Sequence, residues 1–289
     1  MKKIYIINAR NEKTLFSAKK VYRSAKRAGA SNALAKRISR TISDEVYPGM
    51  KTMDIFKRVK QLLAKEEPKT ALRFPLKEAM RRLGPTGFPF EKFIGEIYSR
   101  LGYEVLLNQE IPGHCCRFYE IDFIAKKGNV IYVGECKYRR QAGGKVHSDT
   151  ALSNHARFLD IIKGKFAAGK KVKFKSLLVT NTKFTNKSVD YSECVGVELL
   201  GWNYPKDQGL ENLIESQKLY PVTILPSLKR AWSDALSQKG MMLAEDILKV
   251  NAKKFSKKTI IPLGGLEKLK KEANILLDWH SLVPSLRLI

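Results

Sequence analysis

Carboxylate and ammonium side chains gather in one short stretch of the sequence, residues 119–137. Two runs typical of β-strands flank a Gly-Asn pair at positions 128 and 129, which suits a two-residue hairpin turn because such turns need positive φ angles. With those two residues as the turn, opposed positions sum to 257, so Asp122 faces Glu135.

In the same register Glu120 faces Lys137, and alternate residues of a strand share one face of a sheet. Glu120, Asp122, Glu135 and Lys137 are therefore expected to project together. The opposite face would hold core residues: Ile121, Phe123, Ala125, Tyr132, Gly134, Cys136 and Tyr138.

Two directly opposed carboxylates repel each other as bare charges, because the Cβ atoms of such a pair lie about 4.5–5.5 Å apart. A hard divalent cation, Mg²⁺ or Mn²⁺, removes that repulsion by taking carboxylate oxygens as ligands. Asp122 and Glu135 are therefore candidate metal ligands, and Glu120 is a further candidate. Such an ion activates water and neutralises charge on a phosphate. Lys137 would orient that water or stabilise the developing charge.

A surface hairpin with a solvated charged face explains the same residues without any chemistry. Glu120 and Lys137 would then form an ordinary cross-strand ion pair. The spacing Asp…Glu-x-Lys is loose, so the hairpin alone does not decide between the two interpretations.

An α/β order of elements must position the hairpin. Apolar periodicity predicts helices over residues 90–101 and 151–163, and β-type runs cover 103–107, 119–125, 130–138 and 176–180. A helix, three strands, a helix and a strand make an α/β sheet with an antiparallel start. Asp149 and Arg157 fall on or near the second helix, where they would either approach the site or serve as plain surface residues.

Glycine and proline at residues 83–89 mark the clearest domain boundary. Before it, a short strand is expected at residues 3–7 and helices at 18–28, 32–46 and 52–65. The tail from residue 225 onward reads mainly helical. These patterns predict three domains: 1–84 (α+β), 85–205 (a mixed sheet flanked by helices) and 206–289 (small and helical).

The charge balance indicates a polyanionic partner. Lys and Arg number 54 against 28 Asp and Glu, which gives a net charge of +26. The charge is +15 over residues 1–84, +6 over 85–205 and +5 over 206–289. No apolar run approaches the roughly 20 residues that cross a bilayer, and the four cysteines form no CxxC pair. We therefore expect no membrane partner and a cytoplasmic location.

The hairpin and its surroundings resemble the PD-(D/E)xK nuclease superfamily, in particular Mrr-like restriction endonucleases. Their motif is an acid on one strand and Glu-x-Lys on the next, as at Asp122, Glu135 and Lys137. The stretch 87–93, Gly-Phe-Pro-Phe-Glu-Lys-Phe, is similar to the family's opening helix, in which a Phe-Glu pair puts a glutamate near the metal. The match implies that role for Glu91, and Glu96, one turn later, is the competing candidate.

Residues 16–30 and 52–55 resemble the ATP-cone, a small domain that binds ATP or dATP in regulated nucleotide enzymes. The turn that usually reads Lys-Arg-Asp-Gly in that domain is Asn-Ala-Arg-Asn here, at residues 8–11. The resemblance implies phosphate contacts from Arg10 and Lys20. The alternative is a helical domain whose positive charge contacts the DNA backbone directly.

The two halves together resemble bacterial proteins that join an ATP-cone to a restriction-endonuclease domain. The stretches 236–248 and 261–273 are similar to degenerate helix-hairpin-helix elements, and a plain helical bundle is the alternative there. The resemblance implies a cytoplasmic Mg²⁺-dependent endodeoxyribonuclease that acts on DNA, is regulated by ATP or dATP, and assembles as a homo-oligomer. The competing hypothesis is a nucleotide-sensing DNA-binding regulator that does not cut.

Overall fold

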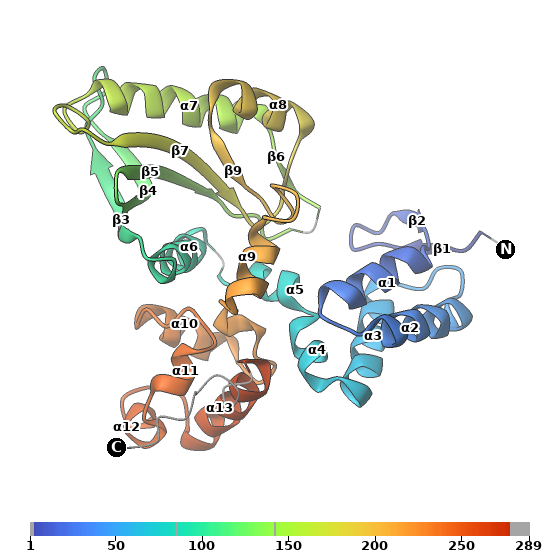
Figure 1. Ribbon diagram of the computed structural model, residues 1–289. Coiled ribbons are helices and arrows are strands. Elements are labelled where there is room, and N and C mark those ends of the chain that lie inside the picture. Colours follow the sequence, from blue (N-terminus) through green and yellow to red (C-terminus); the bar gives the residue numbers. More distant parts are fainter. Residues whose placement is uncertain (1–2, 85, 142, 278–289) are drawn as a thin grey trace, which may run out of the picture. The chain divides into compact units, whose positions relative to one another are not determined.

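The computed structural model describes residues 3–84, 86–141 and 143–277, which form two compact units (Figure 1). The first, called the helical unit here, combines Met1–Ala79 with Ile224–Leu228 and Ile247–Ile289. The second, the sheet unit, comprises Met80–Thr223 and Lys229–Asp246. Within the described residues, no helix has both the length and the apolar character needed to cross a membrane.

A mixed five-stranded sheet organises the sheet unit, in the order β3-β4-β5-β7-β9. The first two pairings are antiparallel and the last two are parallel. The strands are β3 (Glu104–Ile111), β4 (Tyr119–Lys127), β5 (Val130–Lys137), β7 (Lys173–Thr180) and β9 (Glu198–Leu200). The expected α/β class, with an antiparallel start, is therefore confirmed.

Helices cover both faces of this sheet (Figure 1). Helix α6 (Phe88–Arg100) packs on one face, and α7 (Ser148–Lys163) and α8 (Asn186–Val195) lie along the other. A second, two-stranded parallel sheet is formed by β6 (Lys145–Val146) and β8 (Lys183–Phe184). The unit also contains α5 (Leu76–Arg81, at its boundary), α9 (Leu210–Gln217) and α10 (Arg230–Gln238).

The β4–β5 hairpin has the register that the Gly-Asn turn predicts. Phe123 pairs with Gly134 and Lys127 with Val130, so opposed positions sum to 257. Gly128 has a φ of +55°, a conformation that glycine adopts at no steric cost. The turn chemistry therefore sets which residues of the two strands lie side by side.

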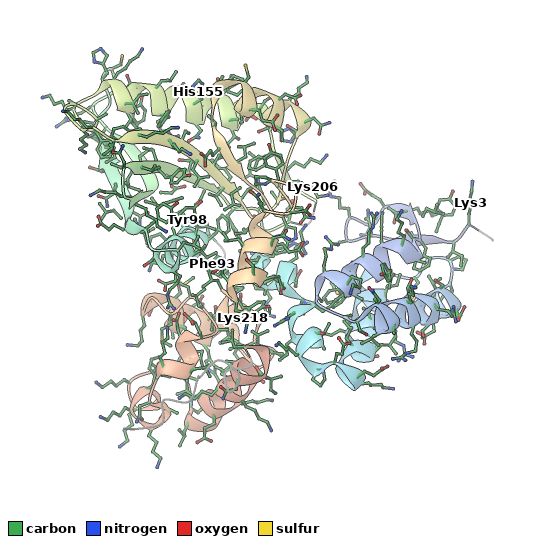
Figure 2. All side chains as sticks on the ribbon, in the orientation of Figure 1. Lys3, Phe93, Tyr98, His155, Lys206 and Lys218 are labelled. Atoms are coloured by element: carbon green, nitrogen blue, oxygen red, sulfur yellow. The ribbon has the colours of Figure 1, made fainter. Side chains whose placement is uncertain are left out.

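Aromatic packing fixes the α6 face of the hairpin. The side chains of Phe90, Phe93 and Phe123 are completely buried, and Figure 2 shows Phe93 and Tyr98 on α6. A Cβ atom at Gly134 would lie 2.2 Å from Cζ of Phe123, so only glycine lets that ring cross the strand. This contact lies directly beside Glu135 in the sequence.

The alternation of side chains between the two faces of β4 fails at Ile121. The prediction that Ile121 shares a face with Phe123 was wrong. Ile121 packs in one cluster with Ile124 and with Ile161 of α7, not with Phe123 on the α6 face. The physical reason is a distortion of the β3–β4 ribbon opposite Asp122. Asn108 has a φ of +50°, and the Asn108–Asp122 pair is missing from the ladder between Leu107–Phe123 and Gln109–Ile121, although the register is the same on both sides.

The helical unit has a small two-stranded sheet and a helical core. Its elements are β1 (Tyr5–Ile7), β2 (Lys13–Leu15), α1 (Ala18–Arg27), α2 (Asn32–Glu45), α3 (Thr52–Glu66), α4 (Pro68–Arg73), α12 (Ala252–Ser256) and α13 (Leu263–Leu277). The short segments η1 (Val222–Ile224) and α11 (Asp246–Lys249) lie at the boundaries of the two units. Ser17 and Ser31 begin α1 and α2 by accepting hydrogen bonds from the amides of Lys20 and Leu34.

Candidate active site

Asp122 and Glu135 lie on adjacent strands, one residue beyond the last backbone pair of the hairpin, Phe123 and Gly134. There β5 stays paired with β7 through Lys137, while the β4 backbone leaves β5. The freed amide of Cys136 donates a hydrogen bond of 2.6 Å to Oδ2 of Asp122. Because the two strands diverge here, the Cys136 amide donates to the Asp122 carboxylate and not to a backbone carbonyl of β4.

Glu135 is buried with two cations. Only 6% of the residue is exposed. The Lys137 ammonium donates to Oε1, and Nη1 of Arg157 donates to Oε2 at 2.7 Å. Each carboxylate oxygen therefore has its own charge-assisted hydrogen bond, the kind of compensation that a buried charge requires.

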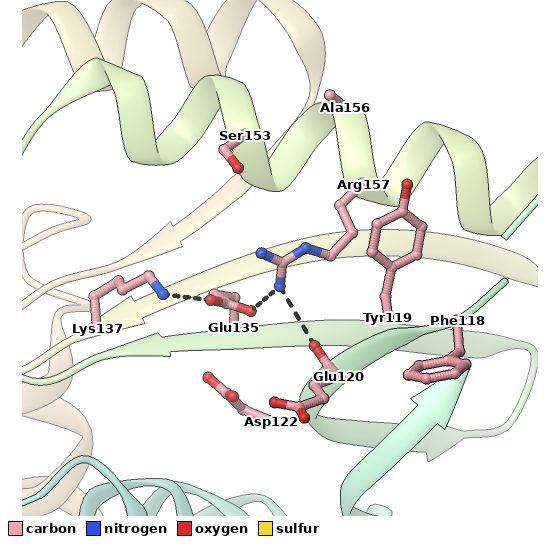
Figure 3. Close-up of a pocket in the computed structure, with 9 residues that line it drawn as sticks. All are labelled: Phe118, Tyr119, Glu120, Asp122, Glu135, Lys137, Ser153, Ala156 and Arg157. Atoms are coloured by element: carbon pink, nitrogen blue, oxygen red, sulfur yellow. Dashed lines mark hydrogen bonds and ion pairs between the residues drawn. The ribbon is translucent and has the colours of Figure 1, made fainter. Parts of the chain in front are cut away.

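These groups line an open pocket of about 780 Å³ between the sheet and α7 (Figure 3). The lining residues are Phe118, Tyr119, Glu120, Asp122, Glu135, Lys137, Ser153, Ala156 and Arg157. The four hairpin residues expected to share one face are therefore found around one pocket, and Lys137 pairs with Glu135. Helix α7 lines one side of this pocket, so the hairpin's charged face is not the fully solvated surface that the alternative interpretation described.

Glu120 takes part in this site mainly through its backbone. Its carbonyl oxygen accepts from Nη1 of Arg157 at 3.4 Å, and its side chain is exposed. Its backbone pairs with Glu110 of β3, beyond the missing Asn108–Asp122 pair. Its role as a metal ligand stays a prediction.

Asp122 carries an unfavourable charge in this pocket. Burial, followed by the negative charge of Glu135, raises the pKa of Asp122 to about 6. The Cys136 amide and the cations of Lys137 and Arg157 act in the opposite direction without cancelling it. The carboxyl group therefore exchanges its proton close to neutral pH.

Glu91, on the first turn of α6, is electrostatically linked to the same cluster. Burial is the largest cause that raises its pKa to about 7, followed by Asp122 and Glu135, while Lys137 lowers it. The competing candidate, Glu96, is held elsewhere because it accepts from Nε of Arg100 at 2.7 Å. Of the two glutamates, Glu91 is the one near the pocket carboxylates.

Arg157 and Tyr119 complete the pocket in a way that sequence reasoning did not settle. The Arg157 guanidinium lies 6.0 Å from the Tyr119 ring centroid, and the Tyr119 hydroxyl donates to Asp160 at 3.1 Å. Asp160 also accepts from the amides of Cys115 and Cys116 at 2.9 and 3.2 Å. One usable signal was helical spacing, because Ala156 and Arg157 follow Ser153 by three and four residues and so share its face of α7.

The residues expected to contact a nucleotide lie in the helical unit. Arg10 is in the β1–β2 turn, where its amide donates to Oδ1 of Asn8 at 2.8 Å. Lys20 is exposed in the first turn of α1, after the capping residue Ser17. The two belong to separate elements, and a nucleotide contact from either stays a prediction.

A divalent cation fits the pocket's donor set. Asp122 and Glu135 offer hard carboxylate oxygens, and Mg²⁺ is commonly held by one or two carboxylates while it keeps several waters. Burial and then the charge of Glu135 raise the pKa of Asp122, and a bound cation would offset both by stabilising the ionised carboxylate. Over the described ranges, no three His, Cys, Asp or Glu side chains are grouped to hold an ion. A cation here would therefore have two side-chain ligands and an open coordination sphere.

Comparison with known proteins gives relatives whose function is not described. Residues 220–277 match the family model for the C-terminal domain of AF1548-like proteins. An uncharacterised protein of Archaeoglobus fulgidus is 34% identical over 157 residues, which are 53% of this chain and 83% of that protein.

Two solved structures are also similar. The crystal structure of AF1548, a protein of unknown function, is 28% identical with a TM-score of 0.57 and covers 66% of this chain and 98% of that chain. Protein VC1899 of Vibrio cholerae is 14% identical with a TM-score of 0.31, covering 70% of this chain and 56% of that one, which is too distant for a structural argument. On the extent of its match to the Archaeoglobus protein, the chain belongs to that protein's family.

Proposed function

We propose that this protein is a metal-dependent DNA endonuclease that hydrolyses phosphodiester bonds. The observation that carries the proposal is the placement of Asp122 and Glu135 side by side in an open pocket, with Lys137 on Glu135. Glu91 and Arg157 add a proton-exchanging carboxyl and a second cation to the same cluster. A substrate phosphate would find both metal ligands and positive charge within one cavity.

The residues have distinct roles in this proposal. Asp122 and Glu135 hold a Mg²⁺ or Mn²⁺ ion, with Glu120 as a further candidate ligand. The bound ion would supply charge neutralisation at the phosphate and an acidified water. Lys137 orients the attacking water through its ammonium group, and Arg157 binds a non-bridging phosphate oxygen.

Glu91 fits the task of moving a proton. With its pKa raised to about 7, the carboxyl can accept a proton from water and release it near neutral pH. Asp122, with a pKa of about 6, is mostly ionised at neutral pH and becomes more so when a cation neutralises its surroundings. We therefore assign Asp122 to the metal and Glu91 to the proton.

The arrangement of elements supports a PD-(D/E)xK type of core for the sheet unit. Helix α6 precedes the antiparallel strands β3, β4 and β5, and α7 leads to the parallel strand β7. This is the order that the sequence resemblance implies. An ATP-cone-like segment at 1–84, with ATP or dATP contacts from Arg10 and Lys20, and helix-hairpin-helix-like phosphate binding within 206–289 belong to the same proposal, as does assembly into a homo-oligomer.

The positive charge supports DNA as the substrate. A net charge of +26 favours a polyanion, and each phosphate neutralised on duplex DNA contributes about −0.9 to the dependence of log K on log salt. Such binding does not depend on the DNA sequence. It would bring the DNA backbone to the pocket without selecting a particular site on the DNA.

Nicking of supercoiled plasmid tests this function directly. The wild-type chain should nick with Mg²⁺ or Mn²⁺ and not with EDTA, while Asp122→Asn and Lys137→Met should bind DNA and fail to nick. Glu198→Gln is the matched control, because Glu198 also pairs with a lysine, Lys175, on the same sheet and outside the pocket. It should nick as the wild type does.

Two results would contradict the proposal. Undiminished nicking by Asp122→Asn would remove this pocket from the reaction. A wild-type chain that binds DNA tightly and never nicks with either metal would favour the non-cleaving regulator.

A further inference from the structure

The small sheet of the helical unit has one packed face and one open face. Strands β1 and β2 pair with Ile6 opposite Thr14 and Tyr5 opposite Leu15. Ile6 is buried in the core of the unit, whereas Tyr5 and Leu15 are 51% and 49% exposed. Because alternate residues point to opposite faces, Tyr5 and Leu15 stand side by side on the open face.

A turn from the end of α2 extends this open face. The amide of Gly49 donates to the Tyr5 carbonyl at 2.8 Å, and Ile7 forms a parallel bridge with Lys51. Tyr47, the residue that opens this turn, is 57% exposed. Two tyrosine rings and a leucine therefore lie at the surface of three adjoining backbone segments.

Lysines surround these side chains. Lys13 is two residues before Leu15 and shares its face of β2, and Lys3 and Lys51 are exposed in or beside the other two segments. Lys3 projects from the β1 end of the unit in Figure 2. Of the nearby acids, Glu12 accepts a hydrogen bond of 2.8 Å from the Asn8 amide group, and Glu45, two residues before Tyr47, is paired with Arg58 at 2.6 Å. The charge around the open face therefore suits an anion.

We propose that this face binds single-stranded nucleic acid, with bases stacked on Tyr5 and Tyr47 and phosphates on Lys3, Lys13 and Lys51. Every base has a π-face, so stacking on aromatic rings accepts any sequence. Duplex DNA hides its base faces and would use the lysines alone. An unpaired strand is the polyanion that uses the rings and the lysines together. This site is separate from the pocket at Asp122 and does not depend on cleavage.

Binding of a fluorescent oligothymidylate to the full chain in EDTA, followed by anisotropy, tests the face. Tyr5→Phe should bind as the wild type does, while Tyr5→Ala should bind roughly 5- to 150-fold more weakly, the range for loss of one stacked base. Tyr5→Leu should be weakened as well, because it keeps apolar bulk and loses the ring. Leu106→Ala is the control, since Leu106 is 58% exposed on β3 of the sheet unit. It should have no effect.

Two further measurements show where the oligonucleotide lies on the protein. An oligonucleotide with photoreactive 4-thiothymidine should crosslink to the peptides that contain Tyr5 or Tyr47. Lys13→Ala should reduce the salt dependence of binding by about 0.7 in the log–log slope, as expected for one phosphate contact on a single strand.

Three outcomes would overturn the proposal. Equal binding by Tyr5→Leu and the wild type would rule out stacking, because leucine keeps the apolar bulk and lacks the ring. Displacement of the oligonucleotide by ATP at equal nucleotide concentration would make the face a mononucleotide site. A fall in solution mass for Tyr5→Ala would make it a contact between copies of this chain. The binding test runs in EDTA and needs no cleavage, so a wild-type chain that never nicks plasmid would leave this proposal standing, which separates the two tests.

Discussion

Glu91 offers a sharp test because its negative charge is unfavourable in the folded protein. Burial, followed by Asp122 and Glu135, raises its pKa from 4.5 to about 7. One pKa unit corresponds to about 1.4 kcal/mol, so the folded protein prefers the protonated carboxyl by roughly 3 kcal/mol relative to the unfolded chain. Because Glu91 is partly exposed and solvent screens part of this repulsion, we expect roughly 1–2 kcal/mol in practice.

The pH dependence has a definite sign. Below a pH of about 4.5, Glu91 is protonated in both states and its titration changes nothing. Between about 4.5 and about 7 the unfolded chain releases the proton while the folded protein keeps it, so the free energy of unfolding falls as pH rises. Glu91→Gln has no charge at this position, so its free energy of unfolding should not fall in this way as the pH rises. At a pH about one unit above 7 it should melt roughly 2–8 °C higher than the wild type, on the scale for domains of this size.

Thermal unfolding followed by circular dichroism in EDTA measures this difference across the pH range. The gap between Glu91→Gln and the wild type should close as the buffer approaches the pKa of an ordinary glutamate. Glu96→Gln is the matched control on the same helix, since Glu96 pairs with Arg100 and should show no such gain at high pH. A Glu91→Gln protein that melts at or below the wild-type temperature in alkaline buffer would refute the reasoning.

Two other substitutions probe the surroundings of Glu135. Gly134→Ala should lower the free energy of unfolding by about 1–3 kcal/mol in denaturant titrations, because its Cβ would overlap the Phe123 ring, and adding Phe123→Leu should recover part of the loss. An unchanged stability would mean that the ring has room to move. Arg157→Gln should bind Mn²⁺ more tightly in calorimetry, because Arg157 competes for Oε2 of Glu135. Equal or weaker Mn²⁺ binding would show that Arg157 does not compete with the ion.

The hairpin at the centre of the site could be predicted because its register is a local property. A Gly-Asn turn fixes which residues are opposed, and the same sum of 257 places Asp122 beside Glu135. The helices of the first segment, from 18 to 66, were likewise readable from apolar spacing, with ends within one residue of those observed. Such features depend on neighbours that are close in sequence.

Features that depend on distant segments could not be read in this way. The approach of Arg157 to Glu135 requires α7 to cross the sheet, and the rotation of Ile121 towards α7 follows from a distortion at Asn108 in another strand. The choice between Glu91 and Glu96 needed the structure too, although Arg100 four residues after Glu96 was a usable sign of a helical ion pair.

The helical unit draws its residues mainly from two segments far apart in the sequence, Met1–Ala79 and Ile247–Ile289, and the whole sheet unit lies between them in the sequence. During synthesis the first of these segments leaves the ribosome long before α13, which packs on α4, whereas the sheet and its covering helices are complete before α13 is added. Domains generally fold as units. The sheet unit is therefore expected to fold first on a growing chain, and the helical unit can complete its core only after Ile247 and the residues that follow it have been added.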